Sequence, residues 1–209
     1  MPYSRLQQFI SYVLIVSILF LQTFEIPFFQ KTQAAEASNS RVVSFIVDES
    51  TYEEFSSEIG TYAKDIEWYM DNVRVAIFPV PRNINPYEIA SINEKLYFEG
   101  DKDGLSQLLG TIIIGPVPLP VVHKDEKTFI SLYPYTDFEE KAFVYNQEKN
   151  YYEFTDKGLT IERPEIWHSV IAPNSGDASR DSDEMSAFFA KTHDFYTSKG
   201  VFSESEKDP

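Results

Sequence analysis

The stretch TIIIGPVPLP, Thr111–Pro120, predicts the centre of the fold. Three consecutive isoleucines before a glycine indicate a strand that is buried on both faces, because a half-exposed strand would alternate apolar with polar residues. Gly115 allows a tight turn after the strand, and the prolines that follow prevent further strand pairing. We therefore expect a central strand of a parallel sheet, followed by a loop, Gly115–Pro120, at the edge where α/β proteins usually bind ligands.

Two strand–helix units precede this stretch. The β-branched runs Val42–Val47 and Val73–Val80 predict strands. Between them, Ser50 and Glu53 form an S-x-x-E pattern that predicts the start of an amphipathic helix. A second helix is predicted over 85–100, with an Asn-Pro start and a glycine after its end. The order βαβαβ implies right-handed crossovers and a parallel sheet that is covered on both faces.

Beyond Pro120 the pattern predicts a β-hairpin over 142–155, a fourth strand of the main sheet over 165–171, and a last helix. Asp181 and Glu184 form a second capping pattern at the predicted start of that helix. The expected fold is a three-layer α/β domain in which a parallel sheet has helices on both faces and the inserted hairpin lies outside the sheet.

Composition limits the chemistry of the chain. Its 209 residues include 33 acidic and 18 basic ones, for a net charge of −15, and this balance argues against a nucleic-acid partner, which requires a basic surface. The chain contains no cysteine, so disulfides, thiolate zinc sites and cysteine nucleophiles are all excluded within it. A hydrophobic content of 43% is enough for the core of one domain.

The N-terminal segment 1–37 is typical of an export signal. Arg5 precedes the apolar run Phe9–Leu21, and Ala35 and Ala37 place small residues at the cleavage positions. Further apolar residues extend the run, so the alternative is an uncleaved membrane anchor formed by residues 6–29. We expect an exported protein that is extracellular or held at the cell surface, with membrane contact only through this segment.

The boundaries of the remaining parts follow from the same patterns. The α/β domain is expected over 38–200, because the last predicted helix ends at Gly200. The acidic, polar stretch 201–209 is expected to be a disordered tail.

Asp137 is a candidate substrate-binding residue. It follows the aromatic sequence Tyr133-Pro134-Tyr135, in a loop that we expect beside the ligand-binding edge of the sheet. A carboxylate at that position is suited to a cationic side chain of a substrate or to a metal. The alternative is an Asp that accepts a hydrogen bond from its own loop backbone.

The acidic loop 174–183 is a candidate calcium site. It concentrates hard oxygen ligands of the kind that Ca²⁺ prefers, namely Asn174, Asp177, Asp181 and Asp183. The spacing does not follow the EF-hand pattern. A solvated loop in which Asp181 caps the following helix explains the same residues.

Other catalytic arrangements have weaker support. Ser131, Ser169 and Ser175 lie near acidic residues or histidines, but none occupies a G-x-S-x-G elbow, which argues against a serine hydrolase. His168 and His193 lack ligand-type partners at helical spacing, which argues against zinc. His168 is instead expected to be a hydrogen-bonded structural residue.

From Gly110 to Gly200 the order of elements resembles the catalytic domain of the gingipain-like cysteine peptidases, relatives of the caspase fold. The corresponding pieces are a buried strand ending in Gly115, a Thr136-Asp137 pair followed by Tyr145, and a Pro164-Glu165-Ile166 strand. A helix with Lys191 shortly before an aromatic residue follows. The chain departs from the family where Gly115-Pro116 replaces Gly-Asp and Ser169-Val170 replaces Gly-Arg.

This resemblance implies that the catalytic residues lie elsewhere. The family uses a His followed by Gly and a Cys at the end of a later strand, and the chain contains neither. We therefore expect an incomplete caspase-like domain: the N-terminal part of an exported cysteine endopeptidase that is inactive alone. Its partners would be the remainder of the same longer chain and a protein or peptide substrate. The alternative is a non-catalytic cell-surface binding or assembly protein on a peptidase-like α/β scaffold.

Overall fold

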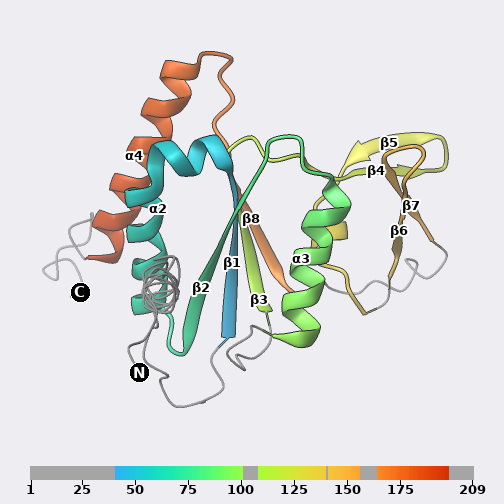
Figure 1. Cartoon of the computed structure of the whole chain (residues 1–209), viewed down its shortest axis with the longest axis horizontal. Helices are drawn as coiled ribbons and strands as arrows, with labels where there is room; N and C mark the ends of the chain where they lie inside the picture. Colours follow the sequence, from blue (N-terminus) through green and yellow to red (C-terminus); the bar gives the residue numbers. More distant parts are fainter. Residues whose placement is uncertain (1–40, 101–107, 140, 156–163, 198–209) are drawn as a thin grey trace, which may run out of the picture. The chain divides into compact units, whose positions relative to one another are not determined.

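The structure is a computed structural model, and it describes residues 41–100, 108–139, 141–155 and 164–197 (Figure 1). The predicted export signal, the predicted tail and the segment 101–107 lie outside the described residues. Within the described ranges, no helix has the length and apolar character needed to span a bilayer.

The main sheet contains four parallel strands in the order β2-β1-β3-β8. They are β1 (Arg41–Asp48), β2 (Val73–Val80), β3 (Leu108–Ile114) and β8 (Trp167–Ile171). The three isoleucines of β3 are almost completely buried, and β3 lies between β1 and β8. The prediction of a central strand there is confirmed.

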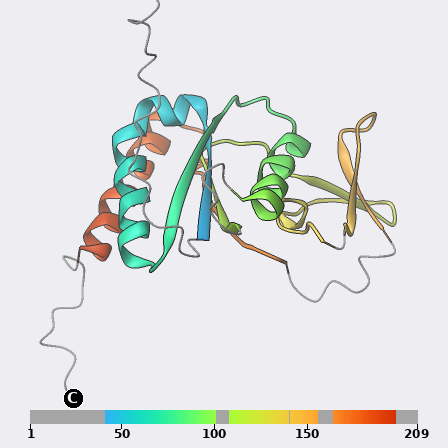
Figure 2. The ribbon, with the colours of Figure 1, turned by 60° about the horizontal axis from the view of Figure 1, so that its bottom comes forward.

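Helices cover both faces of this sheet, as Figure 2 shows. α2 (Glu49–Tyr69) and α4 (Ala178–Tyr196) pack together on one face, over a core that includes Phe45, Ile59 and Phe189. α3 (Pro86–Glu99) covers the other face, with Ile89 and Leu96 turned inward. The predicted α/β class, with a parallel sheet flanked by helices, is confirmed, and the arrangement is compatible with three layers.

A second four-stranded sheet, in the order β5-β4-β7-β6, lies apart from the first. It combines the hairpins β4 (Val121–Lys124) with β5 (Lys127–Ile130) and β6 (Phe143–Asn146) with β7 (Tyr151–Phe154). The short 3-10 helix η1 (Tyr133–Tyr135) connects the hairpins. The hairpin predicted over 142–155 is confirmed and does lie outside the main sheet. It is not a lone insertion, however, because β4 pairs with β7.

Two of the three predicted helix starts are wrong. The N-cap of α2 is Asp48, not Ser50, because the Asp48 carboxylate accepts the backbone N–H of Thr51. The N-cap of α4 is Asp177, not Asp181, so residues 178–183 of the predicted acidic loop are helical. The start of α3 at Asn85 is confirmed, as is the end at Gly100, where φ is 67°.

Candidate functional site

A cavity lies where the strands of the main sheet end. The chain passes from β1 to β2 on one side and then returns to β3 on the other side of β1, so the connections diverge above the ends of β1 and β3. Ligands of open α/β sheets usually bind at such a switch point. A pocket of about 680 Å³ occupies this position and is called the edge pocket below. The loop Gly115–Pro120 contributes Gly115, Pro116, Val117 and Leu119 to its lining, as its sequence position predicts.

Asp48 organises one side of this site. It ends β1, its side chain is 1% exposed, and its Oδ2 accepts hydrogen bonds from the Ser50 hydroxyl and from the backbone N–H and hydroxyl of Thr51. Burial acts to raise the pKa of Asp48, but these hydrogen bonds and the positive charge of Arg82 outweigh it, so the pKa is lowered below 3.8. Asp48 is therefore a buried, ionised carboxylate at the start of α2.

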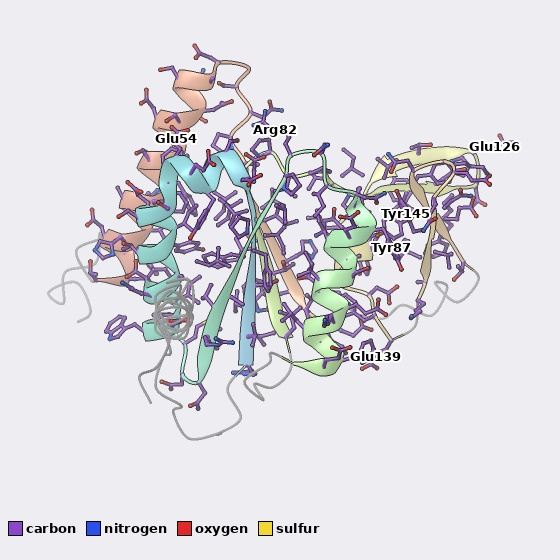
Figure 3. All side chains as sticks on the ribbon, viewed as in Figure 1. Glu54, Arg82, Tyr87, Glu126, Glu139 and Tyr145 are labelled. Carbon is purple, nitrogen blue, oxygen red and sulfur yellow. The ribbon has the colours of Figure 1, made fainter. Side chains whose placement is uncertain are left out.

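Arg82 is the cation of the edge pocket. Its Nε lies 3.5 Å from Asp48 Oδ1, and its side chain is 67% exposed. Among the described residues, Oδ1 has no hydrogen-bond partner, so Asp48 and Arg82 form an ion pair without a hydrogen bond. Figure 3 shows Arg82, from the loop after β2, and Glu54, from α2, at the same end of the main sheet. Asp48 thus anchors a guanidinium group that remains open to solvent at the pocket wall.

Gly115 allows α2 to approach β3 closely. Its φ is 82°, and a Cβ atom built at this residue would lie 2.4 Å from the Thr51 hydroxyl. Its N–H donates to the carbonyl of Ile171, which fixes the end of β3 beside the end of β8. A residue with a side chain would separate these elements, so glycine is required here for packing as well as for the turn.

The start of α4 forms the opposite wall of the edge pocket. Ser182 donates its hydroxyl hydrogen to Glu54 at 2.5 Å, and this bond joins α4 to α2. Asp181 accepts the backbone N–H of Ser175 at 2.7 Å, and the Ser175 hydroxyl together with this N–H lowers the pKa of Asp181. Both carboxylates line the pocket together with Arg82. The pocket therefore presents one cation and two anions above an apolar floor that includes Phe55, Val117 and Met185.

The predicted calcium ligands are only partly brought together. Asn174 and Asp181 line the edge pocket, whereas Asp177 accepts the N–H groups of Ser179 and Arg180 as the N-cap of α4, and Asp183 is exposed on that helix. Among the described residues, no group of three or more His, Cys, Asp or Glu side chains is arranged to hold a metal. Calcium binding by this segment remains a prediction.

Asp137 lies in a different depression, between α3 and the β6–β7 hairpin. This depression, called the hairpin groove below, has a volume of about 340 Å³. Asp137 Oδ2 accepts the backbone N–H of Ala142 at 2.9 Å, so part of its role is to hold its own loop. The preceding Tyr135 is completely buried and donates its hydroxyl hydrogen to the carbonyl of Pro118 at 2.7 Å. Burial raises the pKa of Tyr135, which stays protonated as a structural donor.

Aromatic and charged side chains line the hairpin groove around Asp137. Tyr87 and Tyr145 stack with ring centroids 5.4 Å apart, as Figure 3 illustrates, and Lys141 pairs with Glu94 at 3.1 Å. Because the cation of the groove is already paired with Glu94, the groove offers mainly aromatic surface. Substrate binding by Asp137 stays a prediction.

The candidate serines and histidines do not form a catalytic triad among the described residues. Ser131 accepts the N–H of Tyr133, and Ser175 bonds the backbone of Asp177. His193, on α4, pairs with the buried Asp65, on α2, at 2.9 Å. His168 is exposed on β8 and has no described hydrogen-bond partner, so its predicted structural role is wrong.

Sequence reasoning missed the two residues that define the site. Asp48 directly follows a buried strand and Arg82 follows the next one, and carboxyl ends of neighbouring parallel strands meet at one edge of the sheet. This rule was available from the sequence. The S-x-x-E pattern instead predicted the helix start at Ser50, and no role was predicted for Asp48.

Comparison of this chain with protein-family models, with curated proteins and with solved structures finds no match.

Proposed function

We propose that this chain is the N-terminal, ligand-holding part of the catalytic domain of an exported gingipain-like cysteine endopeptidase, and that it is catalytically silent by itself. The observation that carries the proposal is the edge pocket, which lies at the switch point of the parallel sheet between the ends of β1 and β3. The sequence resemblance supplies the class of reaction, and the pocket supplies a place for the substrate.

The hydroxyl groups of the pocket support a silent role. Ser50 donates to Asp48 and Ser182 donates to Glu54, whereas an activated hydroxyl nucleophile donates its proton to a base such as histidine. None of the described residues that line the pocket is a histidine. Covalent chemistry at this edge would therefore depend on a nucleophile and a base from other residues.

The lining of the pocket favours a peptide as the ligand. A peptide carries backbone carbonyl and N–H groups together with apolar side chains. Arg82 supplies donors, Glu54 and Asp181 supply acceptors, and Val117 and Leu119 supply apolar contact. A ligand with one charge sign alone would meet repulsion from one of the walls.

A second candidate function is binding or assembly without catalysis. It is favoured by the replacement of the family's Gly-Asp and Gly-Arg pairs by Gly115-Pro116 and Ser169-Val170. The position of α4 agrees with this candidate function. α4 packs on the face of the main sheet that α2 also covers, and residues of both helices line the edge pocket. In this version the pocket holds a peptide segment of a partner protein and releases it unchanged.

The test is to express the complete natural reading frame that contains this chain and to incubate it with fluorogenic peptides. We expect a downstream His-Gly pair, a strand-ending Cys and cleavage that a Cys→Ala substitution abolishes. If the frame encodes neither residue, or the complete protein cleaves no peptide, the peptidase proposal is wrong and the binding candidate replaces it.

The assignment of the ligand to the edge pocket has its own test. In the complete protein, Arg82→Ala should raise KM or weaken peptide binding, because it removes the exposed donor of the pocket. Lys141→Ala is the matched control, since it removes a cation from the hairpin groove. A loss of binding in the Lys141 variant alone would indicate that the ligand binds in the hairpin groove and not in the edge pocket.

A further inference from the structure

The end of the domain opposite the edge pocket carries exposed aromatic side chains. All four strands of the main sheet begin at this end, and α2, α3 and α4 end there (Figure 1). Trp68 and Tyr69, at the end of α2, are 72% and 62% exposed, and Phe195, at the end of α4, is 58% exposed. Phe98 and Trp167 are further exposed aromatic residues at this edge.

Aromatic rings at the ends of α2 and α4 contact one another. The rings of Tyr69 and Tyr196 lie 5.2 Å apart, and those of Phe195 and Tyr196 lie 5.5 Å apart. We call the set Trp68, Tyr69, Phe195 and Tyr196 the basal aromatic surface. Tryptophan and tyrosine combine an apolar ring with a polar N–H or O–H group, and this combination is favoured at the headgroup level of a bilayer.

The charges around this surface specify the kind of bilayer. Lys64 precedes Trp68 by four residues on α2, and Lys191 precedes Phe195 by four on α4, so these two exposed rings each have a lysine on the same helix face. Long lysine side chains reach the headgroup phosphates while their stems follow the apolar surface. Acidic residues lie on the same turns, namely Glu67, Asp71 and Asp194. This mixture of charges suits zwitterionic headgroups better than anionic ones.

If residues 6–29 are the uncleaved anchor, the path of the chain limits how far this end of the domain can lie from the membrane. The backbone N–H of Arg41, the first described residue, donates to the carbonyl of Asn72 at 2.7 Å, three positions after Tyr69. The predicted uncleaved anchor, residues 6–29, precedes Arg41 in the sequence. Residues 30–40 can span at most about 40 Å even when fully extended. An anchored chain would therefore have the start of β1, and the end of α2 beside it, within about 40 Å of the bilayer.

From the exposed rings of Trp68, Tyr69 and Phe195, and from the hydrogen bond that places the end of α2 beside the start of β1, we propose that the basal aromatic surface rests on a zwitterionic bilayer. The edge pocket, at the opposite edge of the main sheet, then points away from the membrane. This inference rests on the uncleaved anchor and not on the reaction class proposed above, because it concerns only the orientation of the domain.

The absence of cysteine from the chain allows a direct test. The full chain is incorporated into phosphatidylcholine vesicles as one of two single-cysteine variants, Phe195→Cys or Tyr87→Cys, each carrying a nitroxide label. Tyr87 is the matched control, because it is also an exposed aromatic residue. It lies at the start of α3, at the end of the domain where the strands of the main sheet end. We expect the label at 195 to collide preferentially with oxygen, which concentrates in lipid, and the label at 87 to collide with a water-soluble nickel chelate.

A second measurement uses tryptophan fluorescence. In the Trp167→Phe variant Trp68 is the remaining tryptophan, and phosphatidylcholine brominated near the headgroup should remove roughly half or more of its emission. Equal aqueous exposure of the labels at 195 and 87, or unquenched Trp68, overturns the proposal. Concentration-dependent shielding of Trp68 without vesicles also overturns it, because the surface would then bind a second copy of the chain.

Discussion

Asp48 connects the start of α2 to the edge pocket through its two carboxylate oxygens. One carboxylate oxygen caps α2 and the other faces Arg82, so a single buried charge fixes both the start of a helix and the cation of the edge pocket. Its lowered pKa means that the folded state favours the ionised form. The ionised Asp48 therefore stabilises the folded state fully above its ordinary pKa of 3.8. This contribution is lost as the pH falls through the lower pKa that Asp48 has in the folded state.

Asp48→Asn should destabilise the fold by about 1–3 kcal/mol at pH 7, because hydrogen bonds to an ionised acceptor are stronger than those to an amide. Urea unfolding from pH 7 to pH 2 tests this expectation. The difference between wild type and variant should shrink below pH 3.8 as Asp48 becomes protonated. Glu58→Gln, at an exposed position of α2, is the control and should change the unfolding free energy by less than about 0.5 kcal/mol. A pH-independent difference for Asp48→Asn would contradict the role assigned to its charge.

Two glycines should respond to alanine in opposite directions. A Cβ atom at Gly110 would lie 2.1 Å from the indole of Trp167, its partner across β3 and β8, so Gly110→Ala should cost about 1–3 kcal/mol through overpacking. Gly60, inside α2, has open space around it, so Gly60→Ala should stabilise by about 0.5–1 kcal/mol. Urea unfolding measures both effects. Adding Trp167→Leu should reduce the cost of Gly110→Ala, and failure to do so would show that the indole is not the obstacle.

At the scale of elements, agreement between several local signals decided which predictions succeeded. For α3, Asn85, Pro86 and Gly100 all indicate the same start and end, and the structure has the helix there. For α2 and α4, two candidate caps lie within a few residues of each other. A capping pattern favoured the second residue in both helices, S-x-x-E at Ser50 and D-x-x-E at Asp181, whereas the structure uses an aspartate that lies nearer the preceding strand.

The β4–β5 hairpin was missed because its turn lacks glycine. Asp125 and Glu126 form a two-residue connection with φ values of 49° and 63°, a backbone conformation that usually recruits Asn-Gly or Asp-Gly. The flanking runs Val121–Lys124 and Lys127–Ile130 are short and carry three lysine or histidine residues. Their pairing is stabilised by β7, which is more than twenty residues away in the sequence. Such a long-range contact leaves no local pattern.

The N-cap of α4 gives a prediction at this scale. Asp177→Ala should accelerate the hydrogen exchange of the Ser179 and Arg180 amides and cost about 1 kcal/mol, because both N–H groups lose their acceptor. Asp181→Ala is the matched control, since Asp181 accepts the N–H of Ser175 instead. Exchange measured by NMR separates the two. Faster exchange at Ser179 in the Asp181 variant would indicate that Asp181 caps the helix, as expected from the sequence.

For the whole molecule, the two ends of the parallel sheet have different characters. The carboxyl ends of the strands carry charged groups and a pocket, and the amino ends carry exposed aromatic residues. The buried isoleucines of β3 were enough to predict the sheet and the position of its ligand-binding edge. They were not enough to predict the lining of the pocket, because Asp181 and Ser182 of α4 form part of it. The position of these residues depends on the packing of α4 against α2, which no local sequence pattern encodes.

The outer edge of β8 gives the last prediction. β8 pairs only with β3 among the described strands, four of its five residues are exposed, and two of these are the apolar Trp167 and Val170. An open strand edge with apolar side chains is a template for pairing with another chain. Val170→Lys should therefore lower the self-association of the protein, whereas Ser186→Lys, which adds the same charge on the exposed face of α4, should lower it less. Sedimentation velocity over a range of concentrations measures the difference. An equal effect of the two lysines would mean that a net charge of −15 alone governs association and that the edge of β8 has no part in it.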